Sequence, residues 1–383
     1  MSEEGKQWPG YTGQCNPEVW NEKAKPPQPT EKKIGQLTEE QVDEYFREAI
    51  VLIEDYFDIA ELEAVKEDIE KLVDYLADRL YAEGKIKSKY AEFGFYERLT
   101  KINHDYKGAN VILHKLGIMP QSIRDLWSSD RLCNAVEQLI GPDIGGHPVW
   151  NLRTKTPQDE ATTVPWHQDS AYLDSSSYDK HQVCAWIPLL DATASNGCME
   201  FAMRGHKKGM IAMHQCCDGD THYVMLEKEE MAKSLDVDLE KDLEILPVKY
   251  GSMLLFNNCI PHRSLNNLSG DPGEVRWSLD LRWQNYKEDY GFHGLADGIT
   301  FRKGDDRSWR PQQKEWDDFL KIARITKYNM LENDEAIQDE ILKDSFTLDT
   351  TITGPWMRSW ELTHMNRHTD GLKDYAHVTW HSS

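Results

Sequence analysis

The stretch Trp166-His167-Gln168-Asp169 stands at the end of a predicted β-strand near the middle of the chain. On a strand, residues i and i+2 point to the same face, so the side chains of His167 and Asp169 can bind one metal ion together. A His-x-Asp pattern alone often occurs by chance. Its interpretation therefore depends on the residues that follow it.

A second histidine, His262, comes shortly after the apolar predicted strand Ser252–Phe256. Two imidazoles and one carboxylate occupy one face of an octahedral iron ion and leave the other positions open. Those positions can take a bidentate 2-oxo acid and then dioxygen. Because this set holds no thiolate, it suits Fe(II) better than structural zinc. The sequence therefore predicts that His167, Asp169 and His262 hold Fe(II).

An arginine completes the pattern, because Arg276 opens the next predicted strand after His262. Its guanidinium can bind the distal carboxylate of 2-oxoglutarate with two parallel hydrogen bonds. Ser264 and Ser278 can add hydroxyl donors. The order of His-x-Asp, a long gap, His, a short gap and Arg is far more specific than any of its parts.

Short segments with strand character surround these residues from Gly146 onward, separated by clusters of Gly, Asn, Pro and Asp. Short strands with turns between them at this spacing favour a sandwich or jelly roll. The predicted strands are Val149–Lys155, Val183–Leu189, Met199–Met203, Ile245–Val248, Ser252–Phe256 and Trp277–Trp283.

Helical patterns precede the strands. Thr38-Glu-Glu-Gln41 has the form of a capping box, and the apolar spacing after it predicts a helix that runs on through Ile50 and Leu52. A longer helix is predicted from about Ile59 to Ala82, with one apolar stripe against a charged face. Further helical pattern covers about Ala109 to Leu116 and Pro120 to Ile140. We expect these helices to form a platform beside the strands.

The chain is expected to contain one catalytic domain between two flanking segments. Pro, Lys and Gln are frequent in the first segment, which predicts an extended or disordered lead-in, and the last segment is Trp-rich and charged. The predicted divisions are a lead-in at 1–36, a helical layer at 37–141, a β core at 142–286 and a C-terminal extension at 287–383. The β core contains an acidic insertion at about 216–242. The extension is expected to pack on the core and to carry a helix from about Gln312 to Ile325.

The overall charge limits the classes of molecule that the protein is expected to bind. The 383 residues carry 44 basic and 66 acidic side chains, a formal net charge of −22, which repels nucleic acid and anionic lipid. No apolar run is long enough for a membrane span, and the N-terminus lacks the apolar core of a signal peptide, so we expect a cytoplasmic protein. The seven cysteines include no CxxC pair, which argues against a zinc ribbon.

Several motifs together resemble the phytanoyl-CoA dioxygenase family over about residues 141–283. The motifs that carry this resemblance are Gly141-Pro142, Lys155-Thr-Pro157, Trp166-His-Gln-Asp169, Cys184-Ala-Trp186, Asn196-Gly-Cys-Met199, His206-Lys and Pro261-His-Arg-Ser264. The resemblance implies an α+β protein whose core is a double-stranded β-helix (jelly roll), with an N-terminal helical layer.

The resemblance also implies a set of binding residues. It implies that His167, Asp169 and His262 ligate the metal. It implies 2-oxoglutarate contacts from Arg276, Ser264, Trp186, Lys115 and Asn151, with Lys101 as a rival to Lys115.

The implied reaction uses Fe(II), 2-oxoglutarate and O2 to hydroxylate an aliphatic carbon of a small-molecule metabolite, with release of succinate and CO2 and with ascorbate as a candidate reductant. Alternatives left open are a non-catalytic metal-binding β-helix module, an acyl-CoA or lipid hydroxylase of the same family, and a cupin-type enzyme that uses no 2-oxo acid. The net charge slightly favours a small cationic or zwitterionic substrate over an acyl-CoA thioester. A homodimer through the C-terminal extension is a further expectation, whereas the substrate itself is not predicted.

Overall fold

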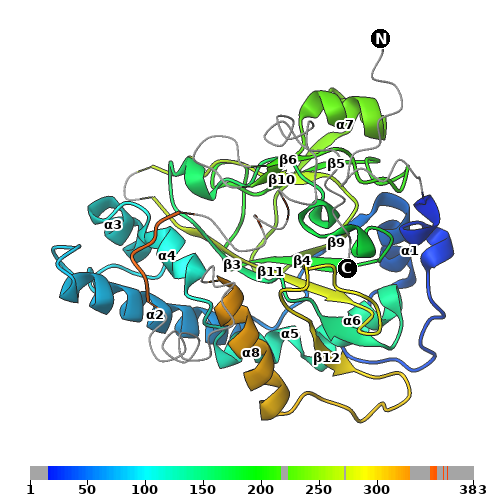
Figure 1. The fold of residues 1–383 in the computed structure, drawn as a ribbon, viewed down its shortest axis with the longest axis horizontal. Helices are drawn as coiled ribbons and strands as arrows, with labels where there is room; N and C mark the ends of the chain where they lie inside the picture. Colours follow the sequence, from blue (N-terminus) through cyan, green and yellow to red (C-terminus); the bar gives the residue numbers. More distant parts are fainter. Residues whose placement is uncertain are drawn as a thin grey trace, which may run out of the picture.

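A large antiparallel sheet crosses the middle of the molecule, with most helices on one side of it and a small sheet on the other (Figure 1). The computed structural model describes residues 16–216, 223–270, 273–327, 346–351, 357 and 360. The strands in this part of the chain are β1 Ile50–Ile53, β2 Ile144–Gly146, β3 Asn151–Lys155, β4 Val183–Pro188, β5 Met199–Ala202, β6 Gln215–Cys216, β7 Val224–Met225, β8 Leu243–Leu246, β9 Met253–Asn257, β10 His262–Ser264, β11 Arg276–Gln284 and β12 Ile299–Arg302.

Strand order places β11 at the centre of the large sheet. Among the described strands the order is β1-β9-β4-β11-β2-β12, and β3 also pairs with β11 beside β2. The small sheet has the order β10-β5-β8, and β6 pairs with β7 separately. The two antiparallel sheets with their helices agree with the expected α+β class, whereas closure into a double-stranded β-helix stays a prediction.

The helices follow the predicted apolar stripes. They are α1 Glu39–Glu48, α2 Ile59–Ala82, α3 Arg98–Asp105, α4 Ala109–Lys115, α5 Gln121–Trp127, α6 Asp130–Ile140, α7 Lys228–Leu235 and α8 Gln313–Lys327. The capping box at Thr38 and Gln41 is confirmed, and α2 has the predicted bounds, with a second capping box at Asp58. The predicted helical segment 120–140 is two helices, because Ser129 leaves helical geometry and its side chain caps α6.

Strand β1 corrects the first helix prediction. The helix ends at Glu48, since Ala49 adopts a left-handed conformation with φ of 64°. The next residues pair with β9, with Ile50 opposite Phe256. Their β-branched and apolar side chains suit a buried strand, and this pairing replaces the helix that spacing alone predicted.

The alternation of side chains along β11 separates the core from the site. Trp277, Leu279, Leu281 and Trp283 are buried in the cluster that joins the sheet to the helical layer. The residues between them are polar and turn to the face that looks toward the small sheet; they are Arg276, Ser278, Asp280 and Arg282. All nine residues of β11 are buried, so these charges need partners inside the protein.

Residues of both expected flanking segments pack into the fold, which the sequence did not indicate for the lead-in. Trp20, within the expected lead-in, is buried, and its Nε1 donates to Asn258 Oδ1 at 3.0 Å. Strand β12 lies in the expected C-terminal extension yet pairs with β2 in the large sheet. Parts of three expected segments lie outside the described residues: 1–15 of the lead-in, 217–222 of the acidic insertion, and 328–345, 352–356, 358–359 and 361–383 of the C-terminal extension. No helix among the described residues is long and apolar enough to cross a membrane.

Two buried histidines are expected to lower the free energy of unfolding in mild acid. Burial lowers the pKa of His147 to about 3 and that of His181 to about 4. The unfolded chain takes up these protons near pH 6.5, so the folded state loses stability as the pH falls from there toward 4 and 3. At pH 5 the two histidines together should cost about 4 kcal/mol, measured as the free energy of unfolding in urea.

The His147→Asn variant gives the control for this prediction. His147 Nδ1 accepts from Val149 N at 3.1 Å, and Nε2 lies 3.1 Å from Tyr290 O, so the ring is held neutral by contacts that a second ring proton would disrupt. The slope of unfolding free energy against pH near pH 5 should fall by about 1.4 kcal/mol per pH unit. The exposed His104→Asn should leave the slope unchanged. Equal slopes in wild type and His147→Asn would contradict the assignment.

Candidate active site

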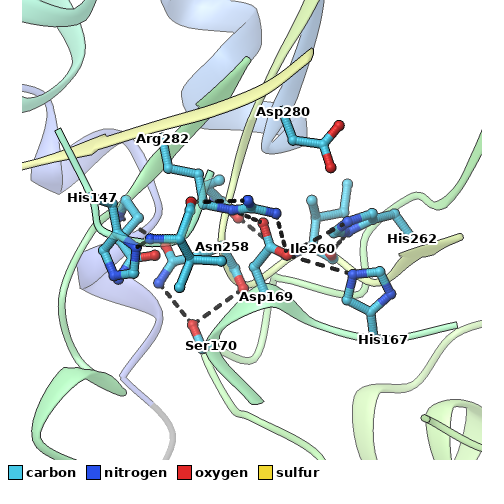
Figure 2. Close-up of polar contacts among 12 residues, drawn as sticks. His147, His167, Asp169, Ser170, Asn258, Ile260, His262, Asp280 and Arg282 are labelled. Carbon is cyan, nitrogen blue, oxygen red and sulfur yellow. Dashed lines mark hydrogen bonds and ion pairs between the residues drawn. The ribbon is translucent and has the colours of Figure 1, made fainter. Parts of the chain in front are cut away.

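The three predicted metal ligands lie close to one another (Figure 2). His167 pairs with His262 through two backbone hydrogen bonds, of 3.0 and 2.9 Å. Asp169 does not continue a strand, as the sequence suggested, but begins a short 3₁₀ helix, Asp169–Tyr172. Its Oδ1 lies 3.5 Å from Nε2 of His167 and 3.9 Å from Nε2 of His262.

Backbone carbonyls orient both imidazoles. Nδ1 of His167 lies 2.8 Å from Pro165 O, and Nδ1 of His262 lies 3.0 Å from Ile260 O. A carbonyl can only accept, so each Nδ1 carries the proton and each Nε2 presents a free lone pair toward Asp169. Burial also lowers the pKa of His262 to about 3, which keeps that ring neutral.

Asp169 is held by a buried arginine on β11. Arg282 Nε donates to Asp169 Oδ2 at 2.9 Å, and Nη2 donates to Oδ1 at 3.0 Å. Burial alone would raise the pKa of Asp169, but the Arg282 guanidinium beside it holds that pKa well below its usual range. Asp169 is therefore ionised. Two neutral imidazole nitrogens and one carboxylate, all within 4.8 Å of one another, fit an Fe(II) ion.

Beside the triad is a pocket with about 390 Å³ of empty space, part of it open to solvent. Its walls are formed by Arg153, Thr162, Val164, His167, Trp186, Met199, Phe256, His262, Ser264, Arg276, Asp280 and Arg282.

Arg276 lies in this pocket together with two of the other expected 2-oxoglutarate contacts. Its Nε donates to Gly197 O at 3.1 Å and Nη1 donates to Ser278 Oγ at 2.6 Å, while its guanidinium carbon lies 5.3 Å from the Trp186 ring centre. Within the described chain Nη2 has no partner. Burial lowers the pKa of Arg276 to about 10, so it stays charged at neutral pH. Ser264 also faces the pocket.

The other expected contacts do not line the pocket. Lys115 forms an ion pair with Asp349 and donates to Thr351 O at 3.0 Å. Its rival Lys101 lies 5.4 Å from the Phe93 ring centre. Asn151 stands opposite Asp280 in the β3–β11 pairing but is absent from the pocket walls. The geometry thus gives no support to 2-oxoglutarate contacts from these three residues.

Three charged pocket residues were not predicted: Arg153, Asp280 and Arg282. All three lie on the strands β3 and β11, at positions in phase with Lys155 or Arg276. A period of two residues, applied outward from Arg276, would have found Asp280 and Arg282. Lys155 is also buried, and its Nζ donates to Ser264 Oγ at 2.9 Å and to Leu265 O at 2.7 Å.

Comparison with known proteins decides the family. The family model for phytanoyl-CoA dioxygenase (PhyH) matches residues 50–274. The chain belongs to the phytanoyl-CoA dioxygenase family. The resemblance found in the sequence and the expected class of enzyme, an oxygenase, are therefore confirmed. The family also supports iron and 2-oxoglutarate as the cofactor and co-substrate.

Individual relatives are more distant. A 1-deoxypentalenic acid 11-beta-hydroxylase of Streptomyces arenae is 28% identical over 181 residues, which cover 45% of this chain and 60% of that protein. The chain thus spans less than two thirds of this relative. The non-heme monooxygenase ThoJ has a TM-score of 0.47 at 17% identity, over 79% of this chain and 99% of ThoJ. The epimerase SnoN, solved with Fe3+, alpha-ketoglutarate and nogalamycin RO, has a TM-score of 0.41 at 17% identity, over 66% of this chain and 86% of SnoN.

Arg282 gives a test of how Asp169 is held. Without the guanidinium, burial would favour the protonated carboxyl, and the carboxylate could rotate away from the histidines. Arg282→Lys keeps one charge but loses the two-pronged contact, so the affinity for Co(II), followed by its visible absorption, should fall about 10- to 100-fold. Arg263→Gln is the matched control, since Arg263 pairs with Glu200 outside the pocket. Unchanged or tighter Co(II) binding in Arg282→Lys would exclude this role.

Proposed function

We propose that the chain is an Fe(II)- and 2-oxoglutarate-dependent dioxygenase that hydroxylates an aliphatic carbon of a small-molecule metabolite and releases succinate and CO2. The observation that supports this is that His167, His262 and Arg276 line one pocket. Asp169 lies close enough to both histidines to share a metal ion with them. A metal site alone would suit many proteins. A buried arginine with a free nitrogen beside that metal site suits a co-substrate with a second carboxylate.

The residues in and beside the pocket have distinct roles in this reaction. When bound, Fe(II) supplies the activation of dioxygen, coupled to oxidative decarboxylation of 2-oxoglutarate. His167, Asp169 and His262 hold the metal, and Arg276 binds the distal carboxylate of the co-substrate, with Ser264 beside it. The apolar walls Trp186, Met199 and Phe256 keep this part of the pocket dry, which strengthens the charged contacts.

The rival functions predict different results. A non-catalytic metal-binding module would bind metal but have no use for Arg276, and a cupin-type enzyme would not bind 2-oxoglutarate. An acyl-CoA or lipid hydroxylase would show the same 2-oxoglutarate chemistry with a larger substrate. The hydroxylase relative suggests 1-deoxypentalenic acid as the first compound to test. A role for ascorbate, a homodimer and a cytoplasmic location stay predictions.

The test is 2-oxoglutarate binding and turnover by protein purified without oxygen. Fe(II) with 2-oxoglutarate should produce a weak visible charge-transfer band, and admission of air should form succinate slowly even without the second substrate. Ascorbate is tested by its omission. Formation of neither the band nor succinate would overturn the dioxygenase and leave the metal-binding module.

A further inference from the structure

Arg153 presents two guanidinium nitrogens to the pocket that no described residue binds. Its Nε donates to Asp280 Oδ2 at 2.6 Å, but Nη1 and Nη2 have no hydrogen-bond partner in the described part of the chain. Arg282 differs, because its Nε and Nη2 bind Asp169 and its Nη1 donates to Val149 O at 3.3 Å. Arg153 is therefore the pocket arginine with the most unused donors.

Asp280 holds the Arg153 guanidinium in place, but only one of its two carboxylate oxygens accepts a hydrogen bond from a described residue. One carboxylate oxygen accepts from Arg153, while Oδ1 is buried and has no partner among the described residues. Asp280 faces the pocket and lies near the triad, on the side of His262 (Figure 2). A buried carboxylate oxygen without a donor is costly, so it marks a place where a ligand can complete the contacts.

The balance of charge around the pocket is positive. Three arginines, Arg153, Arg276 and Arg282, face the two carboxylates of Asp169 and Asp280. One positive charge is left over among these five side chains. Burial lowers the pKa of the neighbouring Lys155 well below its usual range, which favours the neutral amine there. Bound Fe(II) and the 2-oxoglutarate dianion add equal and opposite charges, so the excess persists in the loaded site. Buried charges need partners, and one negative charge on the remaining ligand would neutralise this excess.

We propose that Arg153 binds a carboxylate of the primary substrate, so that the substrate is a carboxylic acid, and that Asp280 positions the guanidinium for this contact. This inference rests on the proposed function, because it assigns the second ligand of the same pocket. The two terminal nitrogens of a guanidinium match the two oxygens of a carboxylate. The hydroxylated carbon then lies elsewhere in the substrate, toward the triad.

This inference revises the sequence-based preference for a small cationic or zwitterionic substrate. The net charge of −22 describes the whole chain, whereas the walls of the pocket carry three arginines. At contact distance and in a low dielectric, these local charges outweigh distant, screened surface charges. A zwitterion can still bind through its carboxylate, but a simple cation would add to the unbalanced positive charge.

Arg153 is an alternative binding partner for 2-oxoglutarate, but its position in the pocket argues against this role. Arg276 is fully buried, donates to Ser278 and lies over the Trp186 ring. Arg153 is more exposed, with 19% of its side chain accessible, and it pairs with Asp280. The more enclosed arginine suits the co-substrate, and the more open one suits the ligand that arrives second.

The experiment uses the full chain loaded with Fe(II) and 2-oxoglutarate in the absence of oxygen. The probes are benzoate, cyclohexanecarboxylate, adamantanecarboxylate and decanoate, each beside its methyl ester, and binding is read from the shift of the charge-transfer band. The wild type should bind at least one acid about 30-fold or more tightly than its ester. Arg153→Gln should bind acid and ester alike, Arg153→Lys should retain part of the preference, and the control Arg263→Gln should retain all of it.

The other possible results of this experiment each contradict one part of the proposal. Equal binding of acids and esters by the wild type, or no response to any acid, overturns the carboxylate site. So does a preference for acids that survives in Arg153→Gln. If Arg153→Gln weakens 2-oxoglutarate binding as strongly as Arg276→Gln does, Arg153 belongs to the co-substrate site instead. Absence of the band in the wild type is a separate failure, that of the dioxygenase itself. If Arg153→Gln does not fold, the comparison of acid with ester in the wild type still tests the carboxylate preference, and Arg153→Lys tests whether Arg153 supplies it.

Discussion

Replacing Asp169 with alanine is expected to abolish Fe(II)-dependent succinate formation and also to destabilise the folded protein. Loss of a ligand should reduce activity by more than about 100-fold, the upper end of what loss of an outer hydrogen-bond partner causes. The variant also leaves Arg282 buried without its counter-charge. Breaking a buried pair in this way costs about 3 to 5 kcal/mol of folding stability.

A second variant separates these two effects. In the double variant Asp169→Ala, Arg282→Leu no unpaired charge remains, so much of the lost stability should return while activity does not. Urea unfolding measures stability, and succinate release together with Co(II) absorption measures the site. Activity that returned with stability would show that Asp169 acts only as the partner of Arg282, and would remove it from the metal site.

The metal site was predictable because its signal is local and chemical. His167 and Asp169 are two residues apart, and His262 follows an apolar strand, so three ligands could be named without knowing the fold. The reason given was only partly right. Asp169 begins a 3₁₀ helix, and the pairing of His167 with His262 is what brings the ligands together.

The pocket residues on β11 were partly predictable. Arg276 was found, but Asp280 and Arg282 share its face and were missed, although the alternation with Trp277, Leu279 and Leu281 is visible in the sequence. An apolar face toward helices and a charged face toward a second sheet is the pattern of a strand that lines a site.

Long-range partners lay beyond sequence reasoning. Lys115 was expected in the pocket, yet it pairs with Asp349, more than two hundred positions further along the chain. Likewise β1 forms because β9 is available to pair with it, whereas local spacing favoured a helix. Such contacts depend on the tertiary arrangement, which overrides weak local propensity.

Replacing Arg276 with glutamine is expected to weaken 2-oxoglutarate binding about 100-fold while leaving metal binding close to that of the wild type. Removing one member of a buried charged contact costs about 2 to 5 kcal/mol. Asp169 and its partner Arg282 are separate from this contact, since Arg276 donates to Gly197 and Ser278. The concentration of 2-oxoglutarate that half-saturates the charge-transfer band measures the effect, with Co(II) affinity and circular dichroism as checks on the site and fold.

A smaller co-substrate makes this prediction specific. 2-Oxobutyrate keeps the metal-binding end of 2-oxoglutarate but lacks the distal carboxylate, so Arg276 can discriminate between the two only through that group. The wild type should prefer 2-oxoglutarate strongly, Arg276→Gln should lose most of this preference, and Arg263→Gln should keep it. If Arg276→Gln weakened both oxo acids equally, the damage would be to the shape of the pocket. Arg276 would then have no direct role in binding the co-substrate, and Lys155, the buried amine that donates to Ser264 Oγ, would become the residue to test.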